Sequence, residues 1–292
     1  LLRFGATVEW ASVWRGVRDQ APASLLLAGA LAVLSHGLVS SYDLVGRHVT
    51  GHGLTVARVW PLAWVSYAFN LNLGALVGGA GLRWRLYARL GLGAAQIAQV
   101  YGLSVATNWL AYPMLLGASL LLAPIAVPGD WAVGRQGLQL AGLLAPLVAL
   151  AYLLACALAP RRRWHWRGHR FDLPSGCVAA VQLLLSTANW LLIAAVIHTL
   201  LGRQVDYAQV LGVTLLAAVA GALAHVPAGL GVLEAVFVGL LGTAMPQHEI
   251  LAALLTYRAL YYLGPLVLAV AVYATMELGW RKGAGAAART TG

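Results

Sequence analysis

The sequence predicts an all-α, polytopic membrane protein built as a helical bundle with two broken helical hairpins. Its 292 residues are 61% hydrophobic and only 10% charged, and the mean hydropathy is +0.78. A water-soluble domain of this size carries a much larger charged fraction. The long runs of leucine, alanine, valine and glycine do not alternate as the strands of a membrane β-barrel do, so the spanning elements should be helices.

Five uninterrupted apolar runs are long enough to cross the hydrocarbon core, which takes about 20 helical residues. They are 23–42, 94–123, 137–159, 177–201 and 250–278. Two further apolar regions, 59–81 and 207–245, are interrupted by glycine, proline or polar residues. We therefore expect one integral membrane domain over 1–292, beginning with a periplasmic segment at 1–22.

The basic residues indicate which side of the membrane each loop occupies. The densest run, RRRWHWRGHR at 161–170, lies between two clear spans, so the loop 161–173 is expected in the cytoplasm. The tail 279–292 should lie on the same side. Binding of anionic lipid headgroups is the alternative role for such a run. We assign the basic pI of about 10.1 to topology and membrane surface, and not to nucleic acid.

These assignments require 207–245 to enter and leave the membrane by one face, because the span 250–278 already returns the chain to the cytoplasm. The segment would then be a re-entrant hairpin that turns at PAGLG, 227–231. If 42–49 is cytoplasmic, 59–81 becomes a second hairpin from the opposite face, broken at NLNLG. Such opposed hairpins line the midplane sites of inverted-repeat transporters. In the alternative, 59–81 is a simple span, and charge barely separates the two arrangements.

The break within HVPAGLGVLE is the first candidate binding site. Pro227 would end the preceding helix, while Gly229 and Gly231 permit positive φ and close approach of a headgroup. Glu234 would begin a half-helix at 232–245, whose free amides can hold an anion. His225 could titrate, although a lone intramembrane histidine more often serves as a hydrogen-bonding residue. The plain alternative is a tight turn in which Glu234 caps its own half-helix.

Arg258 lies within the last span, where an unpaired charge is costly and often functional. Glu234 is its expected partner. The pair is either a static clasp between the hairpin and the last helix or a pair that opens, so that Arg258 can bind a lipid phosphate through two hydrogen bonds. Tyr257 and Tyr261 flank the arginine as candidate pocket hydroxyls.

A second candidate site lies at the first break. Asn70 and Asn72 are at the break, and Arg83 and Arg85 follow GGAG. They are expected either to satisfy backbone groups and set the topology, or to form an access site for an anionic headgroup. The sequence carries no zinc-protease, hydrolase or nucleotide-binding motif. We therefore expect no enzymatic activity, no cofactor and no metal ligands.

Several segments together resemble one family, in order over nearly the whole chain. They are SYDLVGRHVTG, SYAFNLNLGALVGGAGLRWRLYARLGL, ATNWLAYPMLL, STANWLLIAAVIHTLLG, HVPAGLGVLEAVF and AALLTYRALYYLGPLVLA. The chain resembles the YbhN family of bacterial inner-membrane proteins, in the superfamily of the transmembrane flippase domain of lysylphosphatidylglycerol synthase. Members usually begin with one more helix, so we expect another helix before 1–22.

The resemblance implies a lipid translocator, while the lysyl transfer of the synthase belongs to a separate soluble domain and is not carried over. We expect an anionic phospholipid headgroup between the two hairpins, its phosphate neutralised by Arg258 and by the half-helix at Gly231–Glu234. One alternative is a non-transporting scaffold that binds anionic lipid or an envelope partner. Another is a translocator of a polyprenyl-phosphate or hopanoid-type lipid. The sequence leaves the lipid, direction, energy source and oligomeric state open, a homodimer included.

Overall fold

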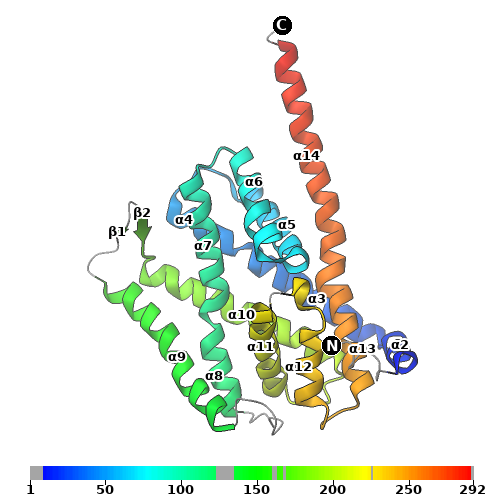
Figure 1. Cartoon of the computed structure of the whole chain (residues 1–292). Helices are drawn as coiled ribbons and strands as arrows, with labels where there is room; N and C mark the ends of the chain where they lie inside the picture. The colour runs from blue at the N-terminus through cyan, green and yellow to red at the C-terminus, as the bar shows by residue number, and fades with distance from the viewer. Residues whose placement is uncertain (1–8, 123–134, 160–162, 167–168, 225, 291–292) are drawn as a thin grey trace.

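The structure is a computed structural model that describes residues 9–122, 135–159, 163–166, 169–224 and 226–290. Its described helices form a bundle, and the last of them projects beyond the rest at the C-terminal end (Figure 1). In chain order the elements are α2 (Trp10–Arg18), α3 (Pro22–Ser40), α4 (Tyr42–Thr50), α5 (Val56–Gly74), the π-helix η1 (Ala75–Gly81), α6 (Leu82–Arg89), α7 (Ala94–Leu110), α8 (Tyr112–Leu122), α9 (Arg135–Leu158), β1 (Arg163–Trp166), β2 (His169–Asp172), α10 (Gly176–Leu200), α11 (Tyr207–Ala224), the 3₁₀-helix η2 (Pro227–Gly229), α12 (Val232–Leu241), α13 (Gln247–Tyr257), the π-helix η3 (Arg258–Leu263) and α14 (Gly264–Thr290).

The membrane character predicted from composition is confirmed by helix length. Among the described residues, five helical segments are long and apolar enough to cross a membrane: 22–50, 94–122, 176–200, 207–224 and 247–280. Apolar side chains cover much of the outer surface of these helices, as expected where lipid and not water is the solvent. The chain is therefore a multi-pass helical membrane protein.

Three parts of the chain differ from the sequence-based expectation. Segment 42–49 is not a loop but helix α4, which packs along α7 and buries Asp43 completely. The run 94–123 is two helices that meet at Ala111, because Pro113 supplies no backbone N–H to continue the ladder. The loop 161–173 contains the antiparallel strands β1 and β2, and the tail continues α14 as helix to Thr290.

The first predicted break is present as a helical hairpin. Helix α5 turns at Gly74, whose φ of +83° is costly for residues with a side chain, and η1 returns along α5. The two limbs approach closely: a Cβ added at Gly78 would overlap the backbone carbonyl of Phe69. Glycine at this position therefore sets the spacing of the hairpin.

The second predicted break is also a bend between two packed helices, α11 and α12. Left-handed backbone occurs at Ala228 (φ +56°), Gly229 (φ +58°) and Gly231 (φ +77°), which reverses the chain within a few residues. The half-helix expected over 232–245 ends earlier, at Leu241. The bend lies against α5, so the two hairpins meet inside the bundle (Figure 1).

Packing around the hairpins fixes their positions. The largest apolar core joins α3, α10, α11 and α13, and a second core joins α5, α6, α7 and α14. Helix α3 lies along α10 and also contacts α5 and η3. Each hairpin is thus attached to its own core, and the region where they meet lies between the two.

The hairpin spacing gives a direct test of the packing. Gly78→Ala should lower the midpoint of thermal unfolding, because the added methyl overlaps backbone and overpacking typically costs about 1–3 kcal/mol. Gly102→Ala is the matched control, since nothing lies within 4 Å of its added Cβ and alanine favours helix by up to about 1 kcal/mol. Equal unfolding midpoints for the two variants in detergent would contradict the close hairpin.

Candidate functional site

A buried ion pair between Arg258 and Glu234 holds the second hairpin to the last helix. Arg258 Nε donates to Glu234 Oε1 at 2.5 Å, and Nη2 donates to Oε2 at 3.1 Å. The same guanidinium also donates to the carbonyls of Ala228 (2.9 Å, from Nη1) and Gly229 (3.1 Å, from Nη2). We call these four bonds the arginine clasp. The predicted pair is therefore confirmed.

Glu234 has a second task in the same bend. Its Oε2 accepts the backbone N–H of Gly231 at 2.9 Å, three residues earlier, which satisfies one of the free amides at the start of α12. The other side of the clasp is Tyr262, whose ring lies 5.5 Å from the Arg258 guanidinium carbon. Arg258 is only 8% exposed, and each of its nitrogens already donates a hydrogen bond. In this conformation the clasp leaves no guanidinium nitrogen unbonded for a substrate.

A cavity of about 400 Å³ lies where the two hairpins meet, a size typical of small-molecule sites. Helices α4, α5, α7, α10 and α11 line it, together with the bend before α12 and the π-helix η3. Its aromatic residues are Tyr42, Tyr67, Tyr101, Trp109, Trp190, Tyr257, Tyr261 and Tyr262. The cavity is therefore mainly apolar and rich in aromatic side chains, with a few polar groups.

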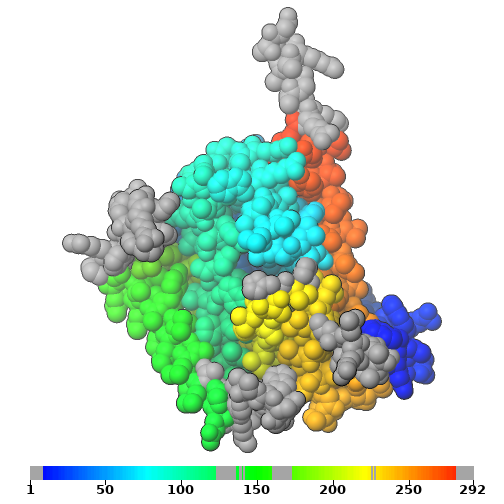
Figure 2. Space-filling view, viewed as in Figure 1, coloured from blue at the N-terminus to red at the C-terminus, as the bar shows by residue number. Residues whose placement is uncertain are grey.

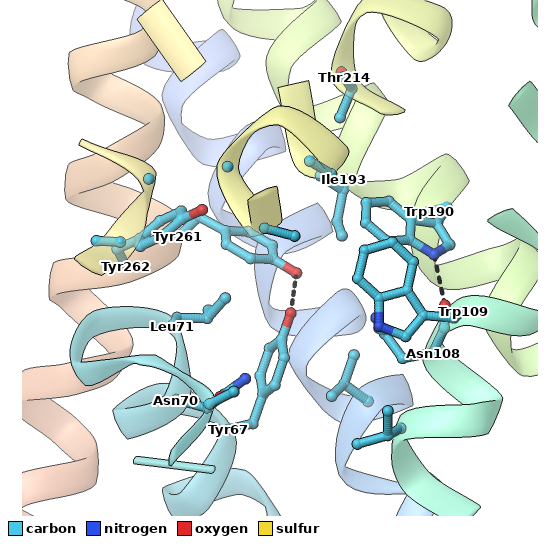
Figure 3. A pocket seen from close by; sticks show the side chains of 18 of the residues that line it. Tyr67, Asn70, Leu71, Asn108, Trp109, Trp190, Ile193, Thr214, Tyr261 and Tyr262 are labelled. Atoms are coloured by element: carbon cyan, nitrogen blue, oxygen red, sulfur yellow. Dashed lines mark hydrogen bonds between the residues drawn. The ribbon is translucent and has the colours of Figure 1, made fainter. Parts of the chain in front are cut away.

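Hydrogen bonds fix the aromatic walls (Figure 3). On one side Tyr67 and Tyr261 point their hydroxyls toward each other at 3.3 Å, and Ser35 Oγ lies 2.6 Å from the Tyr261 hydroxyl. On the other side Trp190 Nε1 donates to the carbonyl of Asn108 at 2.8 Å, and the Trp109 ring lies beside it. The walls are thus held by groups outside the cavity as well as by one another, which keeps it open.

Among the described residues, one cationic side chain lines the cavity, that of Arg83. Its Nε donates to Asp43 Oδ2 at 3.1 Å, and Nη2 makes a longer contact of 3.4 Å with Ser104 Oγ. Tyr87 donates to the same carboxylate oxygen at 2.9 Å, and the Tyr101 ring lies 5.5 Å from the guanidinium carbon. Among the described residues Arg83 Nη1 donates no hydrogen bond. Arg83 is therefore buried and paired, but it keeps donors that Arg258 has already used.

The remaining residues predicted for the first break divide into two groups. Asn70 lines the cavity as expected. Asn72 instead donates to the carbonyls of Ala68 (2.8 Å) and Tyr262 (3.3 Å), which is the backbone-satisfying alternative. Arg85, two residues from Arg83, is on the other side of α6, where it is exposed and lies 3.5 Å from Glu277 of α14.

The residues predicted for the second break are also divided by the structure. Gly229, Tyr257 and Tyr261 line the cavity. Pro227 begins η2, and Gly231, which precedes α12, shapes the bend without lining the cavity. His225 lies outside the described residues.

Sequence reasoning missed most of the cavity wall. Tyr67, Trp109 and Trp190 line it, and Asp43 orients its arginine, yet none was predicted. A usable signal was present, because the dipeptide Asn-Trp occurs at 108–109 and again at 189–190 inside two apolar spans. Polar residues repeated in that position need partners within the bundle.

Comparisons with known proteins agree with the architecture. Residues 1–269 match the family described as Lysylphosphatidylglycerol synthase TM region. The chain is 41% identical to Inner membrane protein YbhN of Escherichia coli over 278 residues, which cover 95% of this chain and 87% of that protein. It is 27% identical to an uncharacterized protein of Synechocystis, over 88% of this chain and 80% of that one.

More distant relatives are larger proteins. Phosphatidylglycerol lysyltransferase of Bacillus subtilis is 27% identical over 256 residues, which cover 84% of this chain but only 28% of that protein. The aligned part is therefore less than a third of that protein's length.

The clasp predicts unequal effects for its two partners. Glu234→Ala should lower the unfolding midpoint more than Arg258→Ala, because a lone carboxylate can take up a proton whereas a lone guanidinium stays charged. Breaking a buried pair from one side costs about 3–5 kcal/mol in soluble proteins. The double variant should recover part of the loss. Thermal unfolding of all three in nanodiscs measures this, and additive losses would show that the two side chains are not coupled.

Proposed function

We propose that this chain, which belongs to the family of the lysylphosphatidylglycerol synthase transmembrane region, translocates a phospholipid by binding its anionic headgroup in the central cavity. The observation that carries the proposal is the cavity itself, which is bounded by both hairpins and contains Arg83. The inner-membrane location expected from the sequence agrees with the name of the E. coli relative, Inner membrane protein YbhN.

Within this proposal the phosphate binds to Arg83. A guanidinium binds phosphate through parallel N–H bonds, and hydrogen bonds to charged groups contribute about 1.5–3 kcal/mol each. Asp43 accepts from Nε and so orients the side chain, while Nη1 donates to none of the described residues and Arg83 lines the cavity. This assigns to Arg83 the role first expected of Arg258, each of whose three nitrogens already donates to the clasp.

The two hairpins are proposed to be re-entrant, from opposite faces of the membrane. The basic run 161–170 and the tail place one face in the cytoplasm, and the threading then brings 207–245 in from the other. Their bends meet at the cavity, and polar groups tolerated at the membrane midplane are usually those that line such a site. An alternative with support in the structure is a non-transporting, lipid-binding scaffold, because the fully bonded clasp suits a rigid protein.

Labelling of introduced cysteines tests the topology. In a variant without Cys156 and Cys177, His48→Cys should react from the cytoplasm only and Gln204→Cys from the periplasm only, because both positions are exposed outside the hairpins. A membrane-impermeant maleimide added to intact cells and to inverted vesicles distinguishes the two sides. Labelling of both positions from the periplasm would contradict opposed hairpins.

Reconstitution tests the function. Proteoliposomes of the parent should move a labelled phosphatidylglycerol between leaflets, and Arg83→Gln should slow this about tenfold or more, the loss expected for one charge-assisted hydrogen bond. Arg89→Gln removes a charge from the same helix at an exposed pair with Glu277 and is the matched control. Binding of lipid by the parent without movement would favour the scaffold. Equal rates for the parent and Arg83→Gln would remove Arg83 from the site.

A further inference from the structure

We propose that the cavity receives its substrate sideways from the bilayer, as an intact lipid whose tails stay outside, through a portal between α7 and α11. The inference rests on the proposed function and adds the route and the kind of molecule that can follow it. A water-soluble headgroup without tails would not be a substrate. The argument uses the bend between α7 and α8, the walls of the opening and its rim.

The bend at Ala111 separates α7 from α11. Below the bend α8 packs against α11, and the Tyr112 hydroxyl donates to the carbonyl of Leu215. Above it α7 packs on α4, α6 and α10 instead. The side chain of Ser186 stabilises the bend by accepting the freed N–H of Ala111 at 3.2 Å. A gap therefore begins where α7 leaves α11, at the level of the cavity.

The same residues that line the cavity are exposed at this gap. On α7 these are Val105, 40% exposed, and Trp109, 37% exposed. On α11 the facing residues are small, and Ala222 is exposed. A side chain that lines a cavity and is also open to the outside marks an opening. Figure 2 shows this face, where α7, the first hairpin and the second hairpin surround a hollow.

The rim of the opening is apolar and its interior is polar. We take the rim to include Leu76, Leu223 and Leu230, each of which is next in the chain to a cavity-lining residue and is 85%, 74% and 56% exposed, respectively. Further in, the cavity is lined by polar side chains that include Tyr42, Ser104 and Asn108. Arg83 Nη1 has donors to spare in the same space. This order suits a lipid that inserts its headgroup while its tails remain against the rim.

The opening also lies along the side of the bundle and not at its end. Its two walls, α7 and α11, belong to helical segments long enough to cross the membrane (Figure 1). A group arriving from water would have to pass the exposed leucines, and transfer of a charged group across apolar surface is unfavourable. A lipid must move its headgroup past the same leucines, but its tails can stay in contact with this apolar rim, which offsets part of the cost and is not open to a headgroup without tails. The route therefore favours molecules that carry lipid tails, although the protein makes no specific contact with those tails.

A bulky residue in the portal tests the route. Ala222→Trp should slow movement of labelled phosphatidylglycerol in proteoliposomes about tenfold, with an unfolding midpoint equal to that of the parent, because position 222 is exposed. Ala271→Trp is the matched control, since Ala271 is exposed on α14 and does not line the cavity. Trp109→Ala, which widens the opening, should speed a lipid with a larger headgroup relative to phosphatidylglycerol.

A second arm separates lipid from free headgroup. Excess glycerophosphoglycerol, which has the headgroup but no tails, should leave the parent rate unchanged. Strong inhibition by this compound would show access from water and overturn the portal. So would a normal rate for Ala222→Trp while the parent is active. If the parent itself moves no lipid, the proposed function fails first, and the portal fails with it.

Discussion

The structure depends on satisfying one guanidinium inside the membrane. Arg258 lies in the last spanning segment, where an unpaired charge is expensive, and it obtains its partners by holding the bend of the second hairpin. The left-handed backbone from Ala228 to Gly231 turns the carbonyls of Ala228 and Gly229 toward it, and Glu234 supplies the countercharge and caps α12. The bend, the half-helix and one wall of the cavity thus form a single hydrogen-bonded unit.

The two buried arginines, Arg258 and Arg83, have different hydrogen-bond partners. On this basis we propose a structural role for Arg258 and a binding role for Arg83. Arg258 donates from every nitrogen and does not line the cavity. Arg83 has one close carboxylate, one long hydroxyl contact and a face on the cavity. An ion pair with unused donors can bind a further anion without first breaking, whereas opening the clasp would leave buried carbonyls and a carboxylate without partners. We therefore propose that substrate binds at Arg83, on α6 next to the first hairpin, and that the clasp keeps the second hairpin in place.

The sequence predicted the features that follow from the free-energy cost of interrupting a helix or of leaving a charge unpaired in the membrane. Glycine and proline in apolar runs located both bends, and the expense of an unpaired charge identified the partner of Arg258. It did not predict the cavity wall, because Tyr67, Trp109 and Trp190 occur in apolar helices where aromatic residues also serve as ordinary core. It also assigned both Arg83 and Arg85 to the candidate site. Two residues apart on a helix, their side chains point in directions about 160° apart. The packing of α4 on α7, which buries Asp43 beside Arg83, is a tertiary contact without a local signal.

The most direct test is the structure of the protein in nanodiscs of phosphatidylglycerol, determined by electron cryomicroscopy. The account predicts headgroup density in the cavity, with a phosphate oxygen within about 3 Å of Arg83, tails leaving between α7 and α11, and the bonds between Arg258 and Glu234 intact. A phosphate bound to Arg258 with Glu234 displaced would contradict the division between the two arginines. A closed cavity without lipid would contradict the proposed site altogether.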